Sequence, residues 1–295
     1  MISTSKSSLI SLILGFISFF FDFEGLKLEY FVSKRSFGNF ALNNRHSNFK
    51  SMCFTVHFGK KSSEELKEYS SKKKGVKINT ELDLNYPKIN GFSHPLLPII
   101  KDSSIDSMYW GLIPSFAKEE NYKDLQKMTL NSRGETIFEK PSFKNSIKNK
   151  RGILVLDGFY EWRHYNKAKY PYYIFPKNGS VFYLGCIYNS WGNNESGEII
   201  DSFSIITTPA NILMEKIHNT KKRMPLILDK KDIENWINPK EDIEKVKNLL
   251  NAYKEGDMDA FTVNFSSIEK NQSFNSGEII KEFIYPEIEL LDSIS

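Results

Sequence analysis

The sequence predicts an α+β protein with a mainly antiparallel, barrel-like β core, peripheral helices and a single domain. Short runs rich in β-branched and aromatic residues dominate the middle of the chain, and helix-like segments are scattered between them. No regular strand–helix–strand alternation appears, which argues against a parallel sheet. The chain has 295 residues, 40% of them hydrophobic and 14% aromatic, and can therefore bury a core of its own.

The expected elements follow in chain order. Residues 53–58 alternate enough to form a short strand, and the charged segment Ser62–Lys74 is expected to be a helix. Further strands are expected at Ile153–Leu156, Tyr172–Phe175, Val181–Ile187 and Phe203–Thr207. Further helices are expected at Asn211–Ile217, Lys231–Ile237 and Glu241–Lys254, the second of them capped by Asp229.

The first 51 residues differ in composition from the rest. Residues 9–21 (LISLILGFISFFF) follow Lys6 and are almost uniformly apolar, which suits the core of a signal peptide better than a membrane span. Residues 27–50 carry five Lys/Arg and one acidic residue, as a transit peptide does. We interpret residues 1–51 as a bipartite leader to a plastid-type organelle. A translation start at Met52, with a nuclear location, and a membrane anchor are the alternatives.

The folded part is expected to be residues 52–284, followed by an acidic, peripheral tail at 285–295. Of the net charge of +4, the leader contributes +3, from six Lys/Arg against three acidic residues. A DNA-binding surface would therefore have to be a local patch. The two cysteines, Cys53 and Cys186, form neither a disulfide framework nor a zinc-site spacing, so we expect no metal and no cofactor.

Several single residues are candidates for chemistry. Glu161 lies in DGFYEW, among aromatic residues and directly after an apolar strand, where a carboxylate is either paired or has a raised pKa suited to proton transfer. A surface position on an alternating strand is the other reading. Taken alone, Cys53 is more often a buried thiol than a nucleophile, and a histidine such as His218 is more often structural than catalytic. Cys186 is expected in the core.

Five motifs in a fixed order carry a resemblance to a known family. They are WGLIPSF (110–116), NSRGETIFEKPSFK (131–144), DGFYEW (157–162), ITTPAN (206–211) and IH…RMPLIL (217–228). From about Met52 to Ile280 the chain resembles the SOS-response-associated peptidase family, the abasic-site processing proteins.

The resemblance implies a covalent mechanism. Cys53, after Met52, matches the family's nucleophile, whose α-amine and thiol close a thiazolidine on the C1′ aldehyde of an abasic deoxyribose. Asn131 would hold the cysteine and the sugar, Glu161 would shuttle protons, and His218 would act as general acid–base and in reversal. The implied partner is single-stranded DNA that contains abasic sites, bound by a monomer.

DNA contacts are expected outside this group. Arg133 matches a phosphate-binding position, with pairing to Glu135 as its alternative. Trp110 and Phe116 would stack on bases or pack in the core. Lys221, Lys222 and Arg223 form a basic cluster expected to contact phosphates.

The chain departs from the family at three places. Cys53 is followed by Phe54 and Thr55 where the family has Gly-Arg, and the family's Asn-x-Ala-Pro segment survives only as INGFSHP (89–95). The spacing from His218 to Arg223 is about three residues longer than in the family. These changes put DNA affinity in question more than chemistry.

Three functions remain open on the sequence. The first is suicide crosslinking to abasic sites in the DNA damage response, with lyase-like chemistry. The second is a cysteine peptidase that acts on protein, including its own N-terminus, without crosslinking DNA. The third is a DNA-binding relative that has lost activity.

Overall fold

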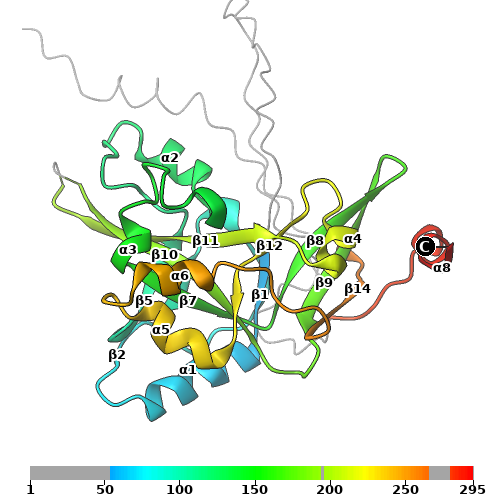
Figure 1. The fold of residues 1–295 in the computed structure, drawn as a ribbon, viewed down its shortest axis with the longest axis horizontal. Coiled ribbons are helices and arrows are strands. Elements are labelled where there is room, and N and C mark those ends of the chain that lie inside the picture. Colours follow the sequence, from blue (N-terminus) through cyan, green and yellow to red (C-terminus); the bar gives the residue numbers. More distant parts are fainter. Residues whose placement is uncertain (1–53, 194–195, 266–279, 295) are drawn as a thin grey trace, which may run out of the picture. The chain divides into compact units, whose positions relative to one another are not determined.

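The computed structural model describes residues 54–193, 196–265 and 280–294 (Figure 1). The leader segments predicted at 9–21 and 27–50, and Cys53 itself, lie outside these residues. The strands are β1 (Thr55–Phe58), β2 (Lys77–Asn79), β3 (Tyr86–Asn90), β4 (Leu96–Ile100), β5 (Ser104–Trp110), β6 (Asn131–Arg133), β7 (Arg151–Leu156), β8 (Gly158–Tyr165), β9 (Ala168–Pro176), β10 (Phe182–Gly192), β11 (Ile199–Pro209), β12 (Arg223–Pro225), β13 (Ile227–Leu228) and β14 (Met258–Thr262). The α-helices are α1 (Lys60–Lys72), α2 (Tyr122–Met128), α3 (Ser146–Asn149), α4 (Ile212–Ile217), α5 (Ile233–Ile237), α6 (Ile243–Asn248) and α8 (Pro286–Ile294), and the 3-10 turns are η1 (Gly91–Ser93), η2 (Gly134–Thr136) and η3 (Lys230–Asp232).

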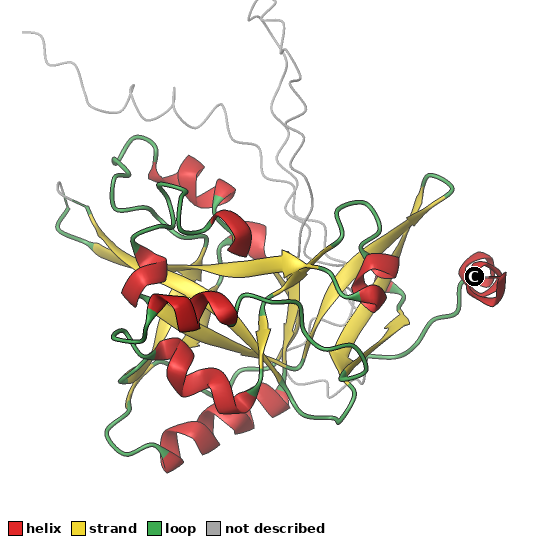
Figure 2. Cartoon of the chain, in the orientation of Figure 1, coloured by secondary structure: helices red, strands yellow, loops and turns green. Residues whose placement is uncertain are grey.

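Two sheets form the β core. The first has the order β14-β9-β8-β1-β3, and every pairing in it is antiparallel. In the second, the antiparallel run β11-β10-β7-β4-β5 closes on itself through a parallel β5–β11 pairing, which makes a five-stranded barrel. The predicted fold class, α+β with a mainly antiparallel, barrel-like core, is therefore confirmed. Helices lie around these strands rather than between them (Figure 2).

Strand β7 shows why the barrel is a packed core. All six of its residues are buried. The four after Gly152 belong to the main hydrophobic core, and β4, β10, α1 and α5 pack against the strand. Arg151 is buried as well, and its guanidinium donates to the carbonyls of Ile147 (2.9 Å) and Trp236 (2.7 Å), at the ends of α3 and α5. A cation at helix C-termini satisfies carbonyls that have no partner within the helix.

Asp157, the first residue of DGFYEW, anchors helix α1 from across the fold. Its Oδ1 accepts hydrogen bonds from the backbone N–H of Gly59 and of Ser62, both at 2.9 Å, and from the Ser62 hydroxyl. These donors lie at the N-terminus of α1, where backbone N–H groups lack helical partners and favour a negative charge. A Cβ on Gly59 would lie 2.7 Å from the Asp157 carboxylate, so this close approach requires glycine.

The predicted strands are all present in the described residues, and β9, β10 and β11 are longer than expected. The helix predicted at Lys231–Ile237 is split into η3 and α5, and the Asp229 side chain makes no capping bond. The helix predicted at Glu241–Lys254 is shorter: α6 begins after Asp242, whose side chain caps Glu244 N–H at 2.7 Å, and ends at Asn248. No helix among the described residues is long and apolar enough to cross a membrane.

The C-terminal segment forms a helix that the sequence analysis did not anticipate. Ile288 of α8 is buried with the main core, and the Tyr170 hydroxyl donates to the Glu287 carboxylate at 3.0 Å. Tyr285, Glu287 and Ile288 therefore contact the folded part of the chain at the end of the first sheet.

Candidate active site

Strand β8 buries Glu161. Tyr160 and Trp162 lie on one face of the strand and contact the Phe265 ring, so the alternation of a strand turns Glu161 to the other face. There Glu161 is 3% exposed, and its Cα partner on β9 is Tyr172. The surface alternative for Glu161 is thereby excluded, because the carboxylate is inside the protein.

Helix α4 packs against β8 (Figure 1), and His218 is the C-cap residue that follows the helix. Asn211 caps the start of this helix by accepting the Met214 N–H at 2.9 Å, so both ends of α4 are fixed. His218 is 2% exposed, and its Nδ1 lies 2.9 Å from the Arg223 carbonyl oxygen. A carbonyl can only accept, so Nδ1 carries the hydrogen, and Nε2 is the ring nitrogen available to take a proton. Nδ1 of His218 is also 3.9 Å from Oε1 of Glu161.

Arg223 connects the NSRGET motif to His218. Asn131 begins β6, which pairs in parallel with β11, and it is buried opposite Ile205. Glu135, in the turn that follows, receives two hydrogen bonds from the Arg223 guanidinium, one of them 2.8 Å between Nη2 and Oε2. Arg223 Nη2 also donates to the Thr207 carbonyl at 2.7 Å.

Charge and burial act in opposite directions on Glu135. Partial burial raises the pKa of this carboxyl, but the hydrogen bonds and the charge of Arg223 outweigh burial, so the pKa of Glu135 is lower than usual. The ionised pair therefore joins NSRGET, which contains Glu135, to IH…RMPLIL, which contains Arg223 and His218. The bond from Arg223 to Thr207 adds ITTPAN, so three motifs that are far apart in the sequence are connected.

Two of the expected DNA contacts are corrected by the structure. Trp110 is fully buried, its ring is stacked against Phe203, and its indole Nε1 donates to the Leu130 carbonyl at 2.9 Å. A ring with no exposed surface cannot stack on a DNA base, so Trp110 is a core residue. Arg223 is only 8% exposed, and its guanidinium is directed at Glu135 and Thr207 rather than at solvent.

The remaining candidates lie nearer the surface. Arg133 is exposed at the end of β6, and Glu135 takes Arg223 as its ion-pair partner instead. Lys221 is partly exposed, and Lys222 is exposed with its Nζ 3.3 Å from Glu215. Phe116 keeps 55% of its surface exposed and can still offer a ring to a base. Cys186 is buried in the barrel, as expected, and burial raises the pKa of its thiol.

The described chain begins at Phe54, one residue after the candidate nucleophile. The Phe54 carbonyl accepts the Gly91 N–H at 2.8 Å, and the Phe54 ring lies 4.5 Å from that of Phe92. The next residue, Thr55, is the register partner of Tyr160, the residue before Glu161. The chain therefore enters β1 alongside the segment of β8 that carries the buried carboxylate.

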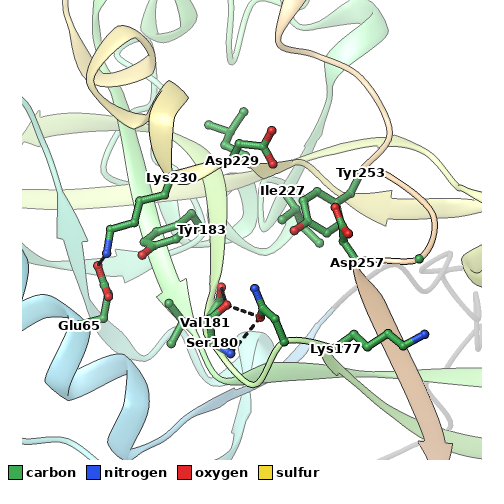
Figure 3. Close-up of a pocket in the computed structure, with 13 residues that line it drawn as sticks. Glu65, Lys177, Ser180, Val181, Tyr183, Ile227, Asp229, Lys230, Tyr253 and Asp257 are labelled. Atoms are coloured by element: carbon green, nitrogen blue, oxygen red, sulfur yellow. Dashed lines mark hydrogen bonds and ion pairs between the residues drawn. The ribbon is translucent and has the colours of Figure 1, made fainter.

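A cavity of about 590 Å³ lies apart from these residues (Figure 3). Its walls include Tyr183, Ile227 and Tyr253, and its Glu65 carboxylate is paired with Lys230 at 2.7 Å. None of the candidate site residues lines it. Across the described ranges, no group of three or more His, Cys, Asp or Glu side chains is arranged to hold a metal ion.

The chain is similar to several known proteins. It is 40% identical over 194 residues to the abasic site processing protein YoqW of Bacillus subtilis, which covers 64% of this chain and 83% of that protein. It is 36% identical over 141 residues to the abasic site processing protein HMCES of Xenopus tropicalis, covering 42% of this chain and 41% of that one. A crystal structure of a Bacteroides thetaiotaomicron protein superposes with a TM-score of 0.72 at 35% identity, over 79% of this chain and all of the other.

The family model described as SOS response associated peptidase (SRAP) matches residues 52–267. This range includes all five motifs and the four residues Glu161, His218, Arg223 and Glu135, which contact one another in the structure. The chain therefore belongs to the SOS response associated peptidase family.

Proposed function

We propose that this protein processes abasic sites in single-stranded DNA by forming a covalent crosslink through an N-terminal Cys53. Two kinds of observation support the proposal. Relatives that match at 40% and 36% identity are named abasic site processing proteins. In this chain the Glu161 carboxylate and the His218 imidazole are 3.9 Å apart in a buried setting suited to proton transfer, and this pair carries the proposal.

The chemistry uses two nucleophiles of one residue. The α-amine of Cys53 adds to the C1′ aldehyde of the open-chain abasic sugar, and loss of water gives an imine. The thiolate of Cys53 then adds to the imine carbon while the nitrogen takes up a proton, which closes a five-membered thiazolidine ring. Both steps need protons to be delivered and removed at the sugar, and neither needs a metal or an oxidant.

Covalent geometry limits where these nucleophiles can act. Successive Cα atoms are about 3.8 Å apart across a trans peptide bond, so Cys53 stays next to Phe54. Phe54 precedes Thr55, which is registered against Tyr160 beside Glu161. We assign proton transfer during ring opening and imine formation to Glu161, and acid–base exchange at the sugar and in reversal to His218. Asn131 would hold Cys53 and the sugar through its amide.

The family's description as a peptidase motivates a second candidate function. In that reading the Cys53 thiol attacks a peptide carbonyl, and its substrate includes the residues ahead of Cys53. The two functions differ in one requirement. A thiol nucleophile works when the Cys53 nitrogen is an amide, whereas an amide nitrogen cannot form an imine.

The test compares two chains by intact-mass spectrometry after incubation with an abasic oligonucleotide. A chain that begins at Met52 and loses that methionine should give a DNA adduct that survives denaturation. A chain verified to retain residues 1–52 should give none, and neither should Cys53→Ala or Cys53→Ser. An adduct from the chain with the extension intact would overturn the thiazolidine mechanism and favour the thiol peptidase.

A further inference from the structure

Asn219 ties the loop that carries His218 to the strand that carries Glu161. Its Oδ1 accepts the backbone N–H of His164 at 3.1 Å, and its Nδ2 donates to the His164 carbonyl at 2.8 Å. The amide thus bonds both backbone groups of one β8 residue, as a neighbouring strand would. His164 lies three residues after Glu161 on the same strand, and Asn219 follows His218 directly in the chain.

The position of this contact in the sheet explains why a side chain fills it. On one side, β8 pairs with β9, where His164 is registered against Lys169. On the other side, the described part of β1 reaches only to Thr55, opposite Tyr160. The amide of Asn219 continues the pairing on this side at His164, so the end of β8 is fixed at both edges.

The loop itself is a tight turn built on His218. The carbonyl of His218 accepts the N–H of Lys221 at 3.2 Å and that of Lys222 at 2.8 Å, and Lys222 adopts a left-handed backbone with φ 51°. Arg223 then returns to the site, where its carbonyl lies 2.9 Å from His218 Nδ1. The turn, with its extra residues, therefore holds the imidazole from the C-terminal side, and the Asn219 amide bonds the turn to the backbone of β8.

We propose that Asn219 is a positioning residue, which sets the distance between Glu161 and His218 by clamping the His218 turn to β8. Asn219 touches neither side chain of the pair and acts through the backbone on both sides. The proposal rests on the proposed function, because it assigns Asn219 to the proton-transfer pair of the crosslinking reaction. It also gives the additional residues between His218 and Arg223 a role, since they place an amide beside His164, beyond the described part of β1.

The first measurement is independent of DNA chemistry. In Asn219→Ala, the His164 amide should exchange its hydrogen faster, while the melting temperature stays close to that of the parent because Asn219 is exposed. Asn251→Ala is the matched control. It removes a similar exposed bond, from the Asn251 amide to the Asn248 carbonyl (2.6 Å), away from the site.

The second measurement is a double-mutant cycle on the rates of crosslink formation and reversal. Asn219→Ala alone should slow the reaction about 3–10-fold, since small displacements of catalytic groups are costly. In a Glu161→Gln background the same change should have less than about a twofold effect, because the distance that Asn219 controls no longer matters.

The outcomes separate the two proposals. If the parent chain with a Cys53 terminus forms no adduct, the proposed function fails, whatever His164 exchange shows. If the parent forms the adduct but Asn219→Ala has an unchanged rate, or its effect is fully retained beside Glu161→Gln, the positioning role is overturned.

Discussion

Nδ1 of His218 lies 3.9 Å from Oε1 of Glu161, and both side chains are almost completely shielded from solvent. The two residues come from different elements, the C-terminal end of α4 and the middle of β8. A carboxylate and an imidazole are both side chains that can transfer protons, and here they lie close together away from bulk water.

Glu161→Gln and His218→Ala should each slow crosslinking or its reversal by roughly 10²–10⁴-fold, the range for loss of a general acid–base group. Glu161→Gln is nearly isosteric, so its fold should be intact by circular dichroism. Rates come from denaturing gels of an abasic oligonucleotide sampled over time. Glu198→Gln, on an exposed loop, serves as a control that should match the parent. Unchanged rates in both variants would remove the pair from the mechanism.

Glu135→Gln should destabilise the protein at neutral pH and much less in acid. The Arg223 pairing keeps the pKa of Glu135 below its ordinary value, so its contribution to stability is present above the ordinary carboxyl pKa. That contribution is lost as the pH falls through the lowered pKa. Loss of two charge-assisted bonds at this half-exposed carboxylate should cost about 1–2 kcal/mol at pH 7. Urea unfolding at pH 7 and pH 3.5 measures the difference, and an equal loss at both values would contradict the prediction.

Neutralising Lys221 and Lys222 together should weaken DNA binding regardless of base sequence. Each phosphate contact to single-stranded DNA contributes about 0.7 to the slope of log affinity against log salt, so the slope should fall by roughly one unit. Lys222 contributes less than a full contact because Glu215 lies 3.3 Å away. The matched control neutralises Lys245 and Lys247 of α6, which also pair with glutamates. The same slope in both double variants would mean that the turn does not touch DNA.

Asp157→Ala should destabilise the fold without touching the reacting groups. The Asp157 carboxylate accepts two backbone N–H bonds of 2.9 Å at the start of α1, and its removal leaves those donors in a buried setting. The expected loss is about 2–4 kcal/mol, from an unsatisfied helix N-terminus and two charge-assisted bonds. Thermal unfolding gives the change, and Ser71→Ala, which removes a local exposed bond on α1, is the control. A melting temperature like that of the control would show that Asp157 does not anchor the helix.

The exposure of each aromatic ring determines whether Trp110 or Phe116 can stack on a DNA base. Trp110→Phe should lower stability through the lost Leu130 bond and leave DNA affinity unchanged, because its ring is buried. Phe116→Ala should weaken binding to single-stranded DNA, by about 1–3 kcal/mol if its exposed ring stacks on one base. Fluorescence anisotropy with a labelled oligonucleotide measures both. The opposite ranking would restore Trp110 as the stacking residue.

The sequence by itself determined the secondary structure where local signals were strong. Runs such as Ile153–Leu156 and Phe203–Thr207 are rich in β-branched and aromatic residues, and they lie within strands β7 and β11. The order of the motifs identified the family, and the same short, specific sequences indicated Glu161 and His218 as the candidates for proton transfer. Helix ends were less well predicted: α6 stops at Asn248, although Leu249 and Leu250 follow it and still pack against the core.

Only the tertiary structure decided which side chains meet and which face solvent. Trp110 and Arg223 have the residue types of DNA contacts, but the barrel closure at β5–β11 buries the first, and the turn after β6 supplies Glu135 to the second. The Asn219–His164 contact joins a loop to a strand 55 residues earlier in the chain, and no local sequence signal records that pairing. Burial and long-range pairing depend on how the whole chain closes, whereas propensity and motif spacing act within a few residues of one another.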